Sequence, residues 1–363
     1  KDGKSLFVLN ADAAQIAVVE VAGGKVARTI TVPSSPTGLA LSPDGATLYV
    51  TSATPKGTVS VIDAASGETK GSIPVGHGAT GPSVSPDGKR LYVCNRFVNN
   101  VALIDLKAKK VTVVPVVREP VQSAVTPDGK QLFVSNLLPI DPSDGYDVAS
   151  VVSVINTDTR EVKGIRLPNG SGSLQGVCVS PDGKYAYAVH ILSRYQMPTT
   201  QLERGWMNTN AMSIIDVAAG KLVNTVLLDD IDLGAARPWG VACTADGKSI
   251  LVTHAATHEL SVIDSAALME KLASVPATEE EAREAGRYDD RSQYSSVTVD
   301  DVPNDLAFLV GIRRRIRLPK GGPWGWLDVD PFEVNGPRGL AVIGAKAYVA
   351  VYFSDKVAVV DLE

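Results

Sequence analysis

The strongest constraint on the fold is a ten-residue motif that returns along the whole chain. In each copy a short apolar start leads into Ser-Pro-Asp-Gly or a close variant, and a β-branched or aromatic run follows. Clear copies stand at 41–50 (LSPDGATLYV), 84–93 (VSPDGKRLYV), 125–134 (VTPDGKQLFV), 179–188 (VSPDGKYAYA) and 243–252 (CTADGKSILV), with weaker ones at the chain start and at 342–351. Self-similarity at a roughly fixed period marks a repeat architecture, so the fold follows from the structure of one repeat.

A second apolar motif follows each copy of the first. Its copies are IAVVE (16–20), TVSVID (58–63), NVALID (100–105), VVSVIN (151–156), AMSIID (211–216), ELSVID (259–264) and KVAVVD (356–361). A small-residue run of the GLALS type precedes the first motif, and a further apolar stretch follows the second. Each run is short, β-branched or aromatic, and bounded by turn residues, which predicts four strands per repeat.

Four strands in each repeat of about 40–45 residues are typical of a β-propeller blade. We therefore predict an all-β fold, a seven-bladed β-propeller of four-stranded antiparallel blades, with residues 1–363 as a single domain. The first blade lacks its first strand and the last blade lacks its fourth. Because proteins avoid open strand edges, we expect the chain to be a segment of a longer polypeptide.

The sixth repeat carries a long insertion, 265–312, between its third and fourth strands. Residues 265–275 and 278–286 have helical propensity and pattern, and 303–314 predicts a third helix. We expect this helical insertion to pack against the blade as a cap.

Charge and cysteine content exclude several classes of protein. The 35 basic and 40 acidic residues give a net charge of −5, which argues against nucleic-acid binding. No apolar run is long enough to span a membrane. The three cysteines, Cys94, Cys178 and Cys243, are too few and too scattered for a disulfide framework, so we expect them to be reduced and structural. No Cys-x-x-Cys-His is present, so the chain attaches no c-type haem.

The longest loops fall at one edge of the predicted blades. They follow the second strand, at 136–150 and 190–211, or the fourth strand, at 229–238 and 318–337. Antiparallel strands place both kinds of loop at the same edge, which we call the insertion face. Long loops on a rigid scaffold commonly carry function.

Basic, aromatic and histidine side chains gather on this face. The candidate binding residues are Arg96, Arg194, Arg204, Trp206, Arg237, Trp239, Arg338 and Tyr352. Arginine suits carboxylates, phosphates and haem propionates, although such arginines also brace loops through backbone carbonyls. His190, His254 and His258 are candidate metal ligands, and hydrogen-bonded loop histidines are the alternative.

The repeated LYV-x-N and VSVID motifs resemble those of YVTN-type propellers, which are common in extracytoplasmic and surface-layer proteins. Three segments, 197–216, 237–264 and 352–361, resemble more narrowly the propeller domains that precede di-haem cytochrome c peroxidase-like domains. The resemblance implies a periplasmic or extracellular location and a c-type cytochrome domain or subunit as partner. Haem c would belong to that adjoining domain or partner, with no cofactor within this chain.

No nucleophile elbow, P-loop or His-Glu-x-x-His motif is present. We therefore expect a non-catalytic docking propeller of a cytochrome electron-transfer system, whose insertion face binds negative charge. One alternative is an enzyme of the lactonase or quinone-dehydrogenase type with an axial pocket. Another is a surface-layer or adhesion repeat protein, which would have short and uniform loops.

Overall fold

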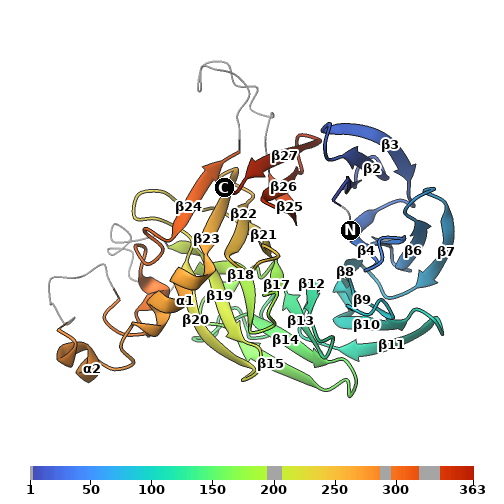
Figure 1. Ribbon diagram of the computed structural model, residues 1–363. Helices are drawn as coiled ribbons and strands as arrows, with labels where there is room; N and C mark the ends of the chain where they lie inside the picture. Colours follow the sequence, from blue (N-terminus) through green and yellow to red (C-terminus); the bar gives the residue numbers. More distant parts are fainter. Residues whose placement is uncertain (1–2, 194–206, 287–295, 319–335) are drawn as a thin grey trace. The chain divides into compact units, whose positions relative to one another are not determined.

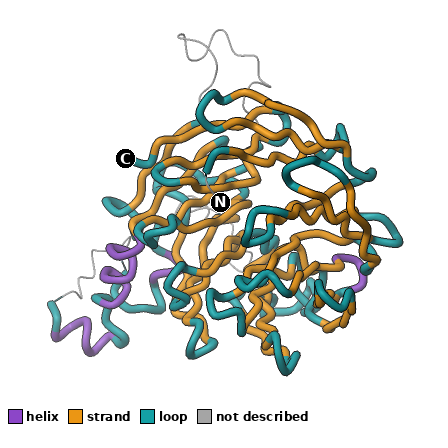
Figure 2. Tube along the Cα trace, turned by 45° about the vertical axis from the view of Figure 1, so that its right-hand side comes forward, coloured by secondary structure: helices purple, strands orange, loops and turns teal. Residues whose placement is uncertain are grey.

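The computed structural model describes residues 3–193, 207–286, 296–318 and 336–363. Strand predominates in these residues (Figure 2). The strands form seven antiparallel sheets, one for each predicted repeat, which confirms the all-β, seven-bladed fold. The chain divides into two compact units: unit 1 comprises Lys1–Ile140 and Val151–Gly164, and unit 2 comprises Asp141–Ser150 and Ile165–Glu363.

The first four sheets begin in unit 1, coloured blue to green in Figure 1. The first sheet contains β1 (Ser5–Asn10), β2 (Gln15–Glu20) and β3 (Lys25–Thr31). The second contains β4 (Pro36–Leu41), β5 (Thr47–Ser52), β6 (Thr58–Asp63) and β7 (Thr69–Pro74). The third contains β8 (Ala79–Val84), β9 (Arg90–Asn95), β10 (Asn100–Asp105) and β11 (Lys110–Pro115), with the 3-10 helix η1 (Arg96–Val98) after β9. The fourth contains β12 (Pro120–Val125), β13 (Gln131–Asn136), β14 (Val151–Asn156) and β15 (Val162–Arg166).

Unit 2 contains the remaining three sheets. The fifth contains β16 (Ser171–Gly172), β17 (Val177–Val179), β18 (Tyr185–Ser193), β19 (Asn208–Asp216) and β20 (Lys221–Leu227), with β16 and β17 both paired to β18. The sixth contains β21 (Pro238–Cys243), β22 (Ser249–His254), β23 (Glu259–Asp264) and β24 (Arg313–Arg317). The seventh contains β25 (Pro337–Ile343), β26 (Lys346–Val351) and β27 (Lys356–Asp361). In the described residues the first and last sheets have three strands each, as predicted.

The Ser-Pro-Asp-Gly motif builds the turn between the first two strands of a sheet. In the third sheet, Ser85 Oγ donates to Asp87 Oδ1 at 2.6 Å, and the same oxygen accepts from Lys89 N at 3.0 Å. The hydrogen bond from Ser85, and to a lesser extent that from Lys89, holds the pKa of Asp87 below its ordinary value. Gly88 supplies the left-handed conformation that the turn needs, with φ of 72°. The motif therefore fixes where one strand ends and the next begins.

The two middle strands of most sheets are buried along almost their whole length, and the fourth strands are largely exposed. Apolar side chains from neighbouring sheets pack between them. In unit 1, Tyr49 and Val59 of the second sheet join Leu91 and Ile104 of the third in one core cluster. Burial on both faces explains why the middle strands read as continuous apolar runs.

The insertion in the sixth sheet lies between β23 and β24, as predicted. It contains α1 (Ser265–Ala273) and α2 (Glu279–Glu284), and α1 lies beside β23 (Figure 1). Asp264 caps α1 by accepting from Ala267 N at 2.9 Å. Leu268 and Leu272 pack into the core cluster of unit 2.

The prediction of a third helix over 303–314 is wrong. Only the 3-10 helix η3 (Val302–Asn304) forms there, followed by turns that bury Phe308 and Leu309. The segment then enters β24, which pairs with β23 and supplies the fourth strand of its sheet. Sheet pairing outweighs local helical propensity at this point. No helix in the described residues combines the length and apolar character needed to cross a bilayer.

Candidate functional site

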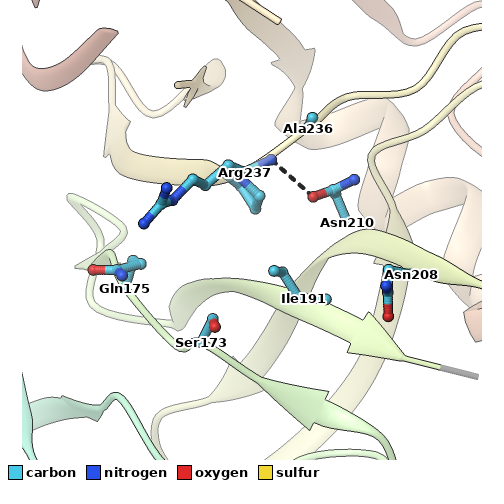
Figure 3. A pocket seen from close by; sticks show the side chains of 8 residues that line it. Ser173, Gln175, Ile191, Asn208, Asn210, Ala236 and Arg237 are labelled. Carbon is cyan, nitrogen blue, oxygen red and sulfur yellow. Dashed lines mark hydrogen bonds between the residues drawn. The ribbon is translucent and has the colours of Figure 1, made fainter. Parts of the chain in front are cut away.

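A small pocket opens at the insertion face of the fifth sheet (Figure 3). Its volume is about 380 Å³. It is lined by Ser173, Gln175, Ile191, Asn208, Asn210, Ala236, Arg237 and Pro238. The lining combines one guanidinium, three carboxamides and a hydroxyl with the apolar side chains of Ile191, Ala236 and Pro238. This set of groups is suited to binding a small polar or anionic group.

A buried carboxylate positions the pocket wall. Asp229 is 1% exposed, and it accepts hydrogen bonds from Asn210 N at 2.6 Å, Asn210 Nδ2 at 3.0 Å and Ala235 N at 2.6 Å. Asn210 Oδ1 in turn accepts from Arg237 N at 2.9 Å, the bond drawn in Figure 3. The loop that carries Arg237 is thereby tied to the start of β19. Arg237 itself has φ of 60°, a left-handed conformation that directs the chain into β21.

Two arginines stack on one tryptophan beside this pocket. The Cζ atom of Arg237 lies 5.5 Å from the centre of a Trp239 ring, and that of Arg338 lies 4.3 Å from it. Arg338 also lies 3.8 Å from the ring centre of Tyr352 and 5.4 Å from that of Phe353. We call these five residues the arginine–aromatic cluster. Tyr352 and Phe353 are 42% and 60% exposed, so the cluster reaches the surface.

The hydroxyl of Thr253 and a close backbone approach hold the main chain of Arg338 against the sixth sheet. Thr253 Oγ1 accepts from Gly240 N at 2.8 Å and donates to Arg338 O at 3.2 Å. A Cβ atom at Gly240 would lie 2.5 Å from Arg338 O, so only glycine permits this close approach. His258 Nδ1 accepts from Gly336 N at 3.2 Å and fixes the entry into β25. His258 is thus a positioning residue for the strand that carries Arg338.

The charges of the cluster are not neutralised within it. Neither Arg237 nor Arg338 has a carboxylate partner among the described residues, and Arg338 Nε is buried there without a hydrogen-bond acceptor. Burial lowers the pKa of Arg338, and the nearby charge of Arg237 lowers it further. Two like charges on one aromatic surface favour the approach of an anion.

Among the predicted binding residues, the structure brings together Arg237, Trp239, Arg338 and Tyr352. Arg96 belongs to unit 1 and pairs with Glu119, whose Oε2 lies 2.9 Å from Nε and 2.8 Å from Nη2. The charge of Arg96 is compensated by these two hydrogen bonds to one carboxylate oxygen. Arg194, Arg204 and Trp206 lie outside the described residues.

In the part of the chain that the structure describes, the candidate metal ligands His190, His254 and His258 do not come together as a metal-binding group. His190 lies within β18 rather than in a loop, and its Nε2 is 2.8 Å from Ser213 Oγ. His254 Nε2 is likewise 2.8 Å from Ser261 Oγ within its own sheet. Across the described ranges, no three His, Cys, Asp or Glu side chains form a group that could hold a metal ion. These histidines follow the alternative interpretation, that of hydrogen-bonded side chains.

Sequence reasoning missed the carboxylates at this face. Asp229 and Asp230 open the loop 229–238, and nothing in the sequence marks them as buried or paired. In the structure Asp229 is buried, and Asp230 pairs with Arg313 and Arg315 of β24. Arg315 also pairs with Glu259, whose side chain is 3% exposed. The sequence did contain one signal for these pairs. In a strand, alternate side chains project to the same face, so Arg313 and Arg315 lie on one face of β24 and Arg314 on the other.

No protein-family model matches the sequence. Over 131 residues the chain is 29% identical to hydrazine synthase subunit beta of Kuenenia stuttgartiensis, an alignment that covers 33% of this chain. That alignment spans only 34% of the length of the curated relative. A solved structure of Kuenenia stuttgartiensis hydrazine synthase matches 99% of this chain and 93% of its own, with a TM-score of 0.81 and 26% identity. The chain is therefore similar, over nearly its whole length, to one chain of hydrazine synthase.

Proposed function

We propose that this chain is a non-catalytic docking subunit of a c-type cytochrome, peroxidase-like electron-transfer system outside the cytoplasm. The observation that carries the proposal is the arginine–aromatic cluster. Arg237 and Arg338 share Trp239, and within the described part of the chain no carboxylate pairs with either guanidinium. A partner that brings carboxylates to this surface would supply the missing negative charge.

The chemistry of the cluster suits an interface centre. Tryptophan, tyrosine and arginine together dominate the binding energy of protein interfaces. The guanidinium fork matches a carboxylate in two parallel hydrogen bonds. The adjacent pocket, lined by Ser173, Gln175 and Asn208, offers neutral donors for a second carboxylate oxygen or for an acidic side chain. Haem propionates and the acidic rim of a cytochrome domain both carry this chemistry.

The comparisons support an assembly role. The curated relative is named as a beta subunit, so by its name it is one of several subunits of an enzyme. The likeness of this chain to propellers that precede di-haem peroxidase-like domains points in the same direction. On this proposal the chain is periplasmic or extracellular, and haem c belongs to the partner or to an adjoining domain.

The test compares binding of the di-haem cytochrome subunit of the same organism to the wild-type chain and to the variant Arg237→Glu/Arg338→Glu. At low salt we expect the wild type to bind and the variant to associate at least about tenfold more slowly, because interface charges act on the rate of encounter. Surface-immobilised protein and a stopped-flow measurement would each give this rate.

The matched control is Arg160→Glu/Lys163→Glu, which makes the same charge change in and beside the turn between β14 and β15, at the edge away from the insertion face. Its association rate should stay within about twofold of wild type. Equal binding by the double variant and the wild type would assign both arginines to loop bracing. A wild-type chain that binds no cytochrome subunit would overturn the proposed function itself.

A further inference from the structure

Two of the three cysteines meet between the fifth and sixth sheets. Cys178 lies on β17 and Cys243 on β21, and their Sγ atoms are 3.8 Å apart. All three cysteines are free thiols. Cys94 is fully buried on β9 in unit 1, whereas Cys178 and Cys243 are partly exposed.

The repeat explains why these two thiols face each other. Cys178 takes the position that Ala40 and Ser83 take in their own first strands, and Cys243 takes the next position, that of Leu41. Neighbouring residues of a strand point to opposite faces. The position of Cys178 therefore faces the following sheet. The next position along the strand, which is that of Cys243, faces the preceding sheet. Cysteine occupies both members of this facing pair only between the fifth and sixth sheets.

The two strands also approach each other closely, as the first strands of neighbouring sheets do at Gly81 and Gly240. A Cβ atom at Gly176 would lie 2.5 Å from Trp239 O and 3.1 Å from Val241 N. This backbone approach lies only a few residues before each cysteine, so the strand separation at the thiols is fixed by the fold. A disulfide holds its sulfurs about 2.05 Å apart. Disulfide formation therefore requires the two Sγ atoms to approach each other from 3.8 Å by rotation about their Cα–Cβ bonds.

We propose that Cys178 and Cys243 are a redox-sensitive site that forms a disulfide between the fifth and sixth sheets when a disulfide-class oxidant reaches the protein. One protein thiolate attacks a sulfur of the oxidant and releases a thiol. The second protein thiolate then attacks the first protein sulfur and releases the other thiol. The two cysteines lose two protons and two electrons, and the S–S bond of the oxidant becomes two thiols.

The surroundings set the rate of this step. The contact with Cys243, together with burial, holds the pKa of Cys178 well above its ordinary value. The thiolate is the reactive form, so oxidation should quicken as the pH rises. The crosslink would tie β17 to β21, the strand that also carries Trp239. Because it closes a long loop in the unfolded chain, it should raise the melting temperature.

The test incubates the full chain with oxidised glutathione at pH 8.5 and counts free thiols after denaturation. We expect three thiols to fall to one, with a peptide containing Cys178 linked to a peptide containing Cys243 in the mass spectrum. Reduction with dithiothreitol should restore three. Cys94→Ser is the matched control, and it should form the same crosslink and lose its last free thiol.

Three outcomes would overturn the proposal. The first is a wild-type chain that keeps three thiols, and the second is a crosslink that includes Cys94. The third is glutathione bound separately to Cys178 and Cys243 with no link between them. Each is read from the wild-type protein, so none depends on whether a cysteine variant folds.

Discussion

His190 and His254 occupy the position at which Asn95 and Asn136 end the second strand of their own sheets. His190 Nε2 contacts Ser213 Oγ, as Asn136 Nδ2 contacts Ser153 Oγ, at 2.9 Å. His190 Nδ1 lies 3.0 Å from the Ile191 carbonyl, which can only accept, so Nδ1 carries the proton of the neutral ring. At this position of the repeat, the histidine side chains therefore form a hydrogen bond within their own sheet.

Burial sets the pH response of His190. It lowers the pKa of His190 to about 4, from 6.5 in the unfolded chain. Between these values the unfolded state binds more protons, so stability falls as the pH drops from 6.5 towards 4. In urea unfolding, His190→Gln should lower the stability difference between pH 7 and pH 5 by about 2 kcal/mol. His77→Gln, which removes a partly exposed imidazole, should keep most of that difference. An unchanged difference in His190→Gln would show that the folded ring is readily protonated.

Strand β24 is held by charge rather than by apolar burial alone. Arg313 and Arg315 have side chains only 3% and 8% exposed, and both pair with Asp230. Arg315 also pairs with Glu259 and donates to Leu233 O at 2.7 Å. The local sequence predicted a helix up to residue 314. Helical propensity depends only on neighbouring residues, so it carries no information on the pairing of this segment with β23. The helices α1 and α2 were predictable because their signals, caps and apolar spacing, are local.

Removal of one buried charge from this network should be costly. Glu259→Gln leaves Arg315 buried with less compensation, and we expect a loss of about 3–5 kcal/mol in the free energy of unfolding. Arg314→Gln, on the exposed face of the same strand, should change it by less than about 0.5 kcal/mol. Chemical denaturation measures both values. The double variant Glu259→Met/Arg315→Met should recover part of the stability lost in Glu259→Gln. If Glu259→Gln lost no more stability than Arg314→Gln, the Glu259–Arg315 pair would not be buried in solution.

At the scale of the molecule, the seven sheets seen in the described residues follow from the sequence, because the motif repeats and each copy carries its own turn chemistry. The candidate site follows only in part. Arg237, Trp239, Arg338 and Tyr352 were predictable because they lie in or next to loops that the topology places at one edge. Asp229 and Asn210, which build the pocket wall, were not, because their partnership joins a strand start to a distant loop. Long-range side-chain contacts leave no periodic signal.

The net charge of −5 should repel an acidic partner at long range, while Arg237 and Arg338 attract it locally. Arg237 is exposed, so salt should screen its contribution, and Arg237→Gln should slow association at low salt but not at about 0.5 M. Arg338 is stacked between rings with a buried Nε, so Arg338→Gln should mainly speed dissociation, and should do so at both salt concentrations. Stopped-flow association and dissociation rates with the cytochrome subunit measure the two effects separately. Identical salt dependence for the two single variants would mean that Arg338 acts at the rim of the interface, in the same way as Arg237.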